Sequence, residues 1–131
     1  MAWSFSPHSP VYCQVAERIR RSILSGEYAP GGQIPSVRQL ALEAAVNPNT
    51  IQHAFSELED QGLIEPRGTV GRFVTENVEI IESIRIIEAE ALVADTVKKA
   101  LELKVSAEKL TEMIAQYTAN KRDKEDIHEH S

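Results

Sequence analysis

The chain has 131 residues, of which 42% are apolar and 26% are charged, as in an ordinary globular protein. No apolar run is long enough to cross a bilayer, and the opening MAWSFSPHSPVY lacks the basic and apolar regions of a secretory signal. The single cysteine, Cys13, excludes an intrachain disulfide and agrees with a reducing, cytoplasmic location.

Net charge and the positions of glycine and proline divide the chain into two parts. Residues 1–75 carry six basic and seven acidic side chains, a net of −1, whereas residues 76–131 carry eight and thirteen, a net of −5. All six glycines and all six prolines lie in the first part. We therefore expect a domain over 1–76, a helical segment over 77–119 and a disordered charged tail over 120–131.

The first predicted helix begins at a serine-proline pair. Ser9 is a plausible N-cap, Pro10 suits the first helical position, and Gly26 is a typical stop. Apolar side chains recur at helical spacing between these signals, which predicts one buried face. That face consists of Tyr12, Val15, Ile19 and Ile23.

A capping box predicts the start of the second helix. Ser36 is the expected N-cap, and Gln39 follows it by three residues, the spacing at which the two side chains cap reciprocally. This short helix is expected to end near Ala45. The preceding pair, Gln33-Ile34, could form a short strand.

The third predicted helix follows after a tight turn. Asn47-Pro48 repeats the cap-then-proline pattern, and Gly62 ends the helix after Gln61. Its inner face consists of Ile51, Ala54, Phe55 and Leu58. Two strand candidates, 63–65 and 72–75, then flank a glycine-containing turn, which predicts a small β-hairpin.

Helical periodicity continues without interruption from Val78 to about Leu103, and Ser106 is the expected cap of a further helix. An apolar stripe along these helices has few partners within so short a chain. A ligand pocket is the less economical explanation, so we expect a second copy of the chain to cover the stripe. The predicted dimerisation residues are Ile80, Ile84, Ile87, Ala91, Leu101, Leu110 and Ile114.

Three helices followed by a hairpin give a mainly α fold in the order of a winged helix-turn-helix, although other small helical domains share that order. Three segments are similar to the GntR family of regulators, in particular its small YtrA-type subfamily: VYCQ at 11–14, IPSVRQLA at 34–41 and VNPNTIQHAFSELEDQGLIEPRG at 46–68. The resemblance implies a winged helix that binds operator DNA as a symmetric dimer. It also implies C-terminal helices that dimerise and are too short to form a separate effector domain.

The resemblance implies DNA contacts from three parts of the chain. Since the chain has no overall excess of positive charge, DNA binding would depend on where its few basic side chains lie. The start of the third helix would enter the major groove, where amide side chains can bond adenine bidentately. The second helix and the wing would contact the DNA beside it. The candidate residues are Ser36, Arg38, Asn47, Asn49, Thr50, Gln52, His53, Arg67, Thr69 and Arg72.

Each candidate also has a plain structural explanation. Asn47 and Ser36 are helix caps, and Gln52 or one wing arginine could be a solvated surface residue. Arg38 is disfavoured by the helix dipole at its position, so either a DNA contact or a carboxylate partner is expected. The chain departs from the family pattern at His53, where arginine is usual, and in the wing, which reads RGTVGRFV instead of RGKGTFV.

Enzymatic chemistry is not indicated. The sequence contains no nucleophile-and-base set, phosphate-binding glycine loop or metal-ligand spacing, and no cofactor is expected. His128 and His130 flank Glu129, a weak pattern for a metal site. We expect a sequence-specific transcription regulator, a repressor that binds an inverted repeat of double-stranded DNA as a homodimer. The alternative is a winged helix that binds proteins; the sequence leaves open whether a small-molecule effector exists.

Overall fold

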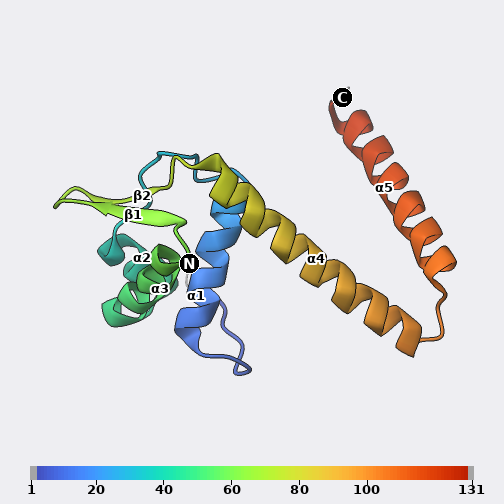
Figure 1. Ribbon diagram of the computed structural model, residues 1–131, viewed down its shortest axis with the longest axis horizontal. Coiled ribbons are helices and arrows are strands. Elements are labelled where there is room, and N and C mark those ends of the chain that lie inside the picture. Colours follow the sequence, from blue (N-terminus) through green and yellow to red (C-terminus); the bar gives the residue numbers. More distant parts are fainter. Residues whose placement is uncertain (1–2, 130–131) are drawn as a thin grey trace. The chain divides into compact units, whose positions relative to one another are not determined.

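The computed structural model describes residues 3–129, with side chains described as far as Glu125. The chain forms two compact units, Met1–Ile86 and Ile87–Ser131, and the division falls inside a helix. The first unit holds three helices, a two-stranded sheet and the first turns of the fourth helix (Figure 1). This is the predicted mainly helical winged helix-turn-helix, followed by two long helices.

Helix α1 spans Val11–Leu24 and differs from prediction at its start. Pro10, and not Ser9, is the N-cap residue, and it has no side-chain cap. The backbone amides of Cys13 and Gln14 donate to the Pro10 carbonyl, while the Gln14 side chain donates to the Ser9 carbonyl. Ser9 is therefore held by an amide side chain from within the helix, and the helix begins one residue later than predicted.

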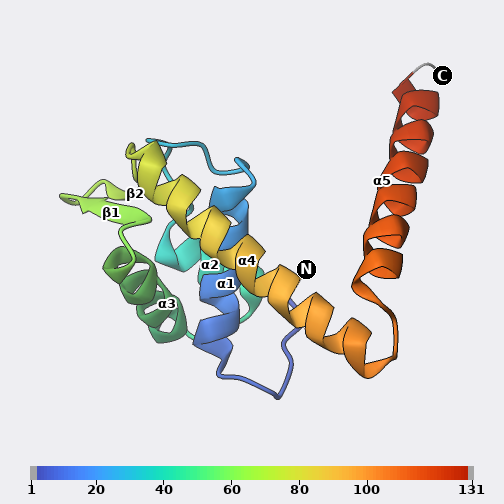
Figure 2. The same cartoon turned by 45° about the vertical axis from the view of Figure 1, so that its right-hand side comes forward.

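Helices α2 (Val37–Ala44) and α3 (Pro48–Asp60) form the helix-turn-helix. The predicted capping box is present: the Gln39 amide donates to the Ser36 hydroxyl at 3.1 Å, and the Ser36 amide donates to the Gln39 side chain at 2.9 Å. Ala45 closes α2 in the left-handed region, with φ of 58°. Figure 2 shows α3 beside both α1 and α2, the two helices against which it packs.

One hydrophobic core joins these three helices to the wing. Its largest fully buried side chains come from α1, α2, α3 and the hairpin. These largest fully buried side chains are Phe55, Ile19, Ile23, Leu40, Ile51, Leu58, Leu63, Val15 and Val74. All four predicted inner-face residues of α3 belong to the core, so the opposite face of α3 is left to solvent.

The wing is an antiparallel hairpin of β1 (Ile64–Arg67) and β2 (Gly71–Val74). Gln33 adds the expected short bridge, opposite Phe73. Gly71 has a φ of +138°, and a Cβ there would lie 2.9 Å from the Gln33 side-chain nitrogen. The backbone conformation at position 71 therefore disfavours any residue other than glycine, and a larger residue would also displace the flexible Gln33 side chain.

Helix α4 spans Val78–Glu102 and α5 spans Ala107–Glu129. The amide of Lys109 donates to the Ser106 hydroxyl, which confirms the predicted cap. The structure continues α5 as a helix through 120–129, where the sequence analysis expects a disordered tail. Lysine, arginine and glutamate are good helix formers, and neither glycine nor proline interrupts this segment. Residues 130–131 lie outside the described part of the chain.

The capping box makes a stability prediction. Ser36→Ala removes the acceptor for the Gln39 amide, so we expect it to lower the free energy of unfolding by about 1 kcal/mol. For a domain of this size, that corresponds to a fall of about 4–8 °C in melting temperature. Calorimetry of the whole chain measures this. Ser83→Ala is the matched control, because Ser83 lies inside α4 and its hydroxyl bonds only the Glu79 carbonyl; an equal loss in both variants would contradict the capping role.

Candidate nucleic-acid interface

The outer face of α3 carries the predicted base-reading residues. Asn47, Asn49, Gln52 and His53 are exposed, and Thr50 is half-buried. Asn47 is the cap of α3, since its side chain accepts from the Asn49 amide at 2.8 Å. The α3 face that avoids the core is therefore polar and uncharged along its first two turns, which suits hydrogen bonding to base edges.

Arg38 lies in the first turn of α2, the helix that packs against α3, and its side chain is exposed. Within residues 3–125, Arg38 has no hydrogen bond or ion pair, so the carboxylate partner considered for it is not found. Ser36, two residues earlier, uses its hydroxyl in the capping box. An uncompensated guanidinium at a helix N-terminus is electrostatically costly, and an external anion would relieve it.

Both predicted wing arginines are held by carboxylates. A nitrogen of Arg67 lies 3.0 Å from Glu65 and 3.5 Å from Glu76, and its guanidinium lies over the Phe73 ring. Arg72 lies 3.0 Å from Glu59. None of these pairings was predicted from the sequence, and for Arg72–Glu59 no spacing rule joins a residue of a strand to a residue of a preceding helix. Thr69, in the turn, is exposed.

His53 stacks on a residue of another helix. Its ring lies parallel to that of Tyr12 in α1, with the centroids 3.5 Å apart and the planes at 9°. A hydrogen bond with Cys13 is the main cause that raises the pKa of the Tyr12 hydroxyl above 10, so Tyr12 is neutral near pH 7. The sequence pattern predicts Tyr12 on the buried face of α1. In the structure, the Tyr12 side chain is half-buried and supports the His53 ring at the edge of the α3 face.

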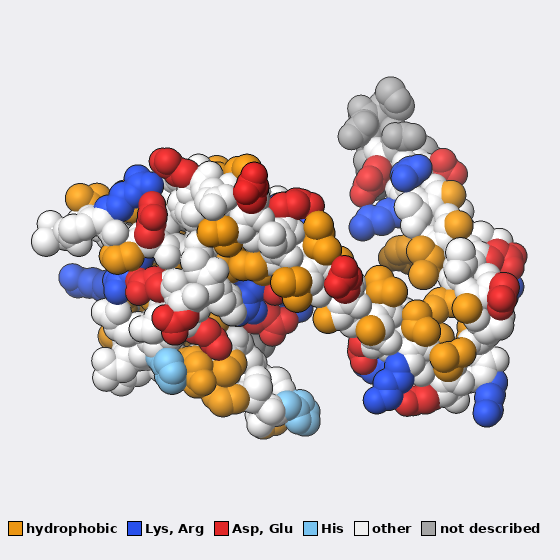
Figure 3. All heavy atoms as spheres, viewed as in Figure 1, with side chains coloured by type: hydrophobic (Ala, Val, Ile, Leu, Met, Phe, Trp, Pro, Cys, Tyr) orange, Lys and Arg blue, Asp and Glu red, His pale blue; other side chains and the backbone are white. Residues whose placement is uncertain are grey.

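The predicted dimerisation stripe is divided between the two units. Ile80 and Ile84 pack against the core of the first unit, and Ile81, which the prediction did not include, is buried there. In the second unit, Ile87, Leu101 and Ile114 are 64%, 56% and 55% exposed. Ala91 is also exposed, and Leu110 is half-buried. Figure 3 shows hydrophobic side chains gathered along the end of α4 and along α5.

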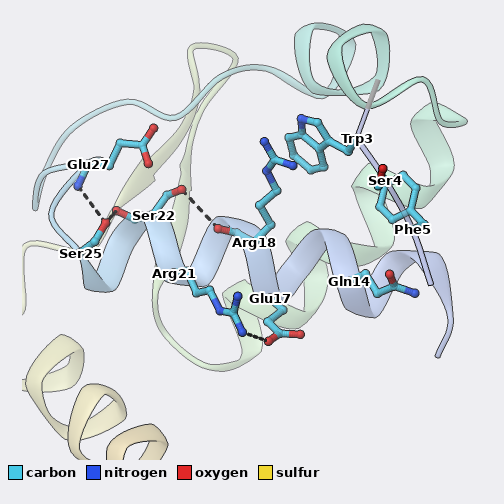
Figure 4. Close-up of a pocket in the computed structure, with 10 residues that line it drawn as sticks. All are labelled: Trp3, Ser4, Phe5, Gln14, Glu17, Arg18, Arg21, Ser22, Ser25 and Glu27. Carbon is cyan, nitrogen blue, oxygen red and sulfur yellow. Dashed lines mark hydrogen bonds and ion pairs between the residues drawn. The ribbon is translucent and has the colours of Figure 1, made fainter. Parts of the chain in front are cut away.

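A pocket lies on the solvent side of α1, between this helix and the N-terminal segment (Figure 4). The Arg18 guanidinium covers the Trp3 ring at 4.0 Å, and the Trp3 ring nitrogen is buried without a hydrogen-bond partner. Arg21 and Glu17 form an ion pair at the rim. These residues are separate from the α3 face.

The described residues contain no group of three or more histidine, cysteine or acidic side chains that could hold a metal ion. The histidines near the C-terminus, His128 and His130, lie outside the residues whose side chains are described. No described helix is long and apolar enough to cross a membrane.

The comparisons with known proteins agree with this arrangement. The family model for bacterial regulatory proteins of the gntR family matches residues 11–74. The HTH-type transcriptional regulator YhcF of Bacillus subtilis is 35% identical over 114 residues, which cover 87% of this chain and 94% of YhcF. The repressor YtrA of the same organism is 39% identical over 69 residues, 53% of each chain.

Solved structures of other proteins are also similar to this chain. A GntR family transcriptional regulator from Listeria monocytogenes superposes with a TM-score of 0.80 at 31% identity, over 86% of this chain and 98% of its own. AraR(DBD), solved in complex with operator ORX1, gives a TM-score of 0.53 at 32% identity, over 57% and 95%. Because YhcF is matched over almost its whole length, this chain belongs to the GntR family of bacterial regulatory proteins: it is a DNA-binding transcription regulator and not an enzyme.

Proposed function

We propose that the protein represses transcription by binding an inverted-repeat operator as a homodimer, with α3 in the major groove. The observation that carries this proposal is the exposed polar face of α3, together with an exposed arginine on α2, Arg38, that has no hydrogen bond or ion pair within residues 3–125. The likeness of the first unit to AraR(DBD), which was solved with its operator, supports the placement of α3. The repressor YtrA supports the direction of regulation. Action on bacterial DNA would locate the protein in the cytoplasm.

The homodimer is supported by the second unit. Within residues 87–125, Ala100 is the one buried apolar side chain, whereas Ile87, Leu101 and Ile114 are exposed. Exposed apolar side chains in such number are typical of a surface that another chain covers. A twofold dimer presents two copies of α3 to one face of the duplex, so its binding site would be an inverted repeat.

Selection from a random duplex library tests this proposal. We expect the full chain to enrich an inverted repeat whose half-sites lie about one helical turn apart. Affinity for the selected duplex should fall steeply with salt, since phosphate contacts release counterions. A single unrepeated half-site would contradict the dimer. No enrichment, with salt-independent binding, would favour the protein-interaction alternative.

Position 53 makes a further prediction that rests on this proposal. His53 is exposed on the α3 face, and its ring stacks on Tyr12 of α1. His53→Arg should tighten DNA binding and steepen its salt dependence, because arginine is always charged, can form two hydrogen bonds with a phosphate or guanine, and also stacks on aromatic rings.

DNA affinity measured against salt concentration for both proteins tests the His53 prediction. His8→Arg is the matched control, because His8 is exposed in the N-terminal segment and lies outside the α3 face. The affinity and salt slope of His8→Arg should follow those of the wild type. Equal affinity and salt slope for the wild type and His53→Arg would exclude a DNA contact at position 53.

A further inference from the structure

The side chain of Arg72 extends from the wing to α3. From β2, its Nε donates to Glu59 Oε1 at 3.0 Å, and one terminal nitrogen donates to Gln52 Oε1 at 3.2 Å. Its guanidinium also lies 5.0 Å from the centre of the buried Phe55 ring. Three partners, all in α3, therefore fix the position of this guanidinium.

The ion pair with Glu59 is better protected than the other ion pairs of the first unit. The side chains of Arg72 and Glu59 are 28% and 29% exposed, whereas those of Arg67 and Glu65 are 39% and 51% exposed. Partial burial raises the cost of separating such a pair, because the carboxylate would be left without a partner. Arg72 is therefore poorly suited to leave α3 and contact a DNA phosphate.

The contact with Arg72 sets the orientation of the Gln52 amide. A guanidinium has five N–H donors and no acceptor, so only the oxygen of the amide can face it. Rotation of the amide by half a turn would bring two sets of donors together. The Gln52 oxygen is thus held toward the wing, and its NH₂ group, which has no hydrogen-bond partner within residues 3–125, remains available as a donor.

We propose that Arg72 is a positioning residue that makes Gln52 read a hydrogen-bond acceptor on one base of each half-site. The acceptors of the major groove are purine N7, guanine O6 and thymine O4, whereas cytosine presents only its N4 donor. Cytosine is therefore rejected at this position. This inference rests on the proposed function, because it requires α3 to lie in the major groove.

Without Arg72, the amide of Gln52 turns freely and offers either its donor or its acceptor. Discrimination against cytosine at that single position should then fall by about two- to tenfold, the equivalent of one hydrogen bond. The other positions of the half-site should keep their preferences. A role limited to stabilising the fold would weaken all sequences alike and would leave the relative preferences unchanged.

The experiment compares base preferences of the full chain and its variants at every position of the selected duplex. Arg72→Thr is the first variant, since threonine suits a strand and cannot reach α3; Arg72→Met is the second, in case the first melts at working temperature. Arg21→Met is the matched control, because Arg21 is an exposed arginine of α1 that pairs with Glu17 and is not among the candidate DNA contacts. Gln52→Ala and its combination with Arg72→Thr complete a double-mutant cycle.

We expect Arg72→Thr to relax one position of each half-site and Arg21→Met to relax none. Arg72→Thr should have no added effect on preference once Gln52 is alanine. Equal weakening of all sequences, with a smaller salt slope, would overturn the inference and make Arg72 a phosphate contact. Unchanged preferences would overturn it as well. A wild-type protein without any sequence preference would instead overturn the proposed function on which the inference rests.

Discussion

Arg38→Ala should weaken binding to the selected operator strongly and leave the fold intact. Arg38 is exposed in the first turn of α2 and has no hydrogen bond or ion pair within residues 3–125, so its loss removes no polar contact of the free protein. A lost base contact costs about 1–3 kcal/mol per site, and a dimer loses two. We therefore expect the affinity to fall by about 30-fold or more, with the melting temperature unchanged.

The sequence and salt dependence of the affinity loss shows which part of the DNA Arg38 contacts. If it contacts a base, the loss is specific to one position; if it contacts phosphate, all sequences weaken alike and the salt slope shrinks. Arg21→Ala is the control, since Arg21 is an exposed arginine on α1 that pairs with Glu17 away from α3. Operator affinity equal to the wild type, at an unchanged melting temperature, would make Arg38 an ordinary surface residue.

The second large effect is expected in the C-terminal unit. Ile114→Glu places a carboxylate among the exposed apolar side chains of α5. If a second chain covers this surface, the buried charge costs several kcal/mol and the dimer dissociates at micromolar concentration. Operator affinity should then fall by at least about tenfold, because each half-site must be bound by a separate chain.

Gln116→Glu is the matched control for this prediction. Gln116 is exposed and lies two residues further along α5, about 200° around the helix, so it adds the same charge on the opposite face. The Gln116→Glu protein should remain dimeric. Sedimentation of both variants decides the matter, and a dimeric Ile114→Glu protein would show that this part of α5 lies outside the interface.

A truncated chain offers a further check, but its end must follow the structure. The composition shift suggests ending after Asn77. Ile81, however, is 4% exposed in the core of the first unit, with Ile80 and Ile84 packed against it. The truncated chain therefore has to retain α4 as far as Ile86, the last residue of that unit.

Local signals in the sequence predicted the local structure well. The Ser36–Gln39 capping box and the glycine stop after α3 depend on neighbours within a few residues, and both are present. The high charge of residues 120–131 indicates disorder, whereas the same lysine, arginine and glutamate residues favour the helix that the structure has as far as Glu129. At the start of α1, either Ser9 or Pro10 could precede the first turn, and the sequence pattern does not distinguish them.

Contacts between distant segments could not be read from the sequence. The pairs Arg72–Glu59 and Arg72–Gln52 join a strand to a helix, and the Tyr12–His53 stack joins two helices. They depend on the packing of whole elements, for which no spacing rule exists. The apolar stripe of α4 was ambiguous for a similar reason: isoleucines at helical spacing look alike whether they pack in a domain core or against a second chain.

The mass of the protein–DNA complex tests the central claim most directly. Sedimentation equilibrium of the full chain would be measured on the selected duplex and on a duplex with one half-site replaced. We predict two chains per duplex on the intact inverted repeat, and a large loss of affinity when one half-site is replaced. One chain per intact duplex, bound equally well to both DNAs, would contradict the account.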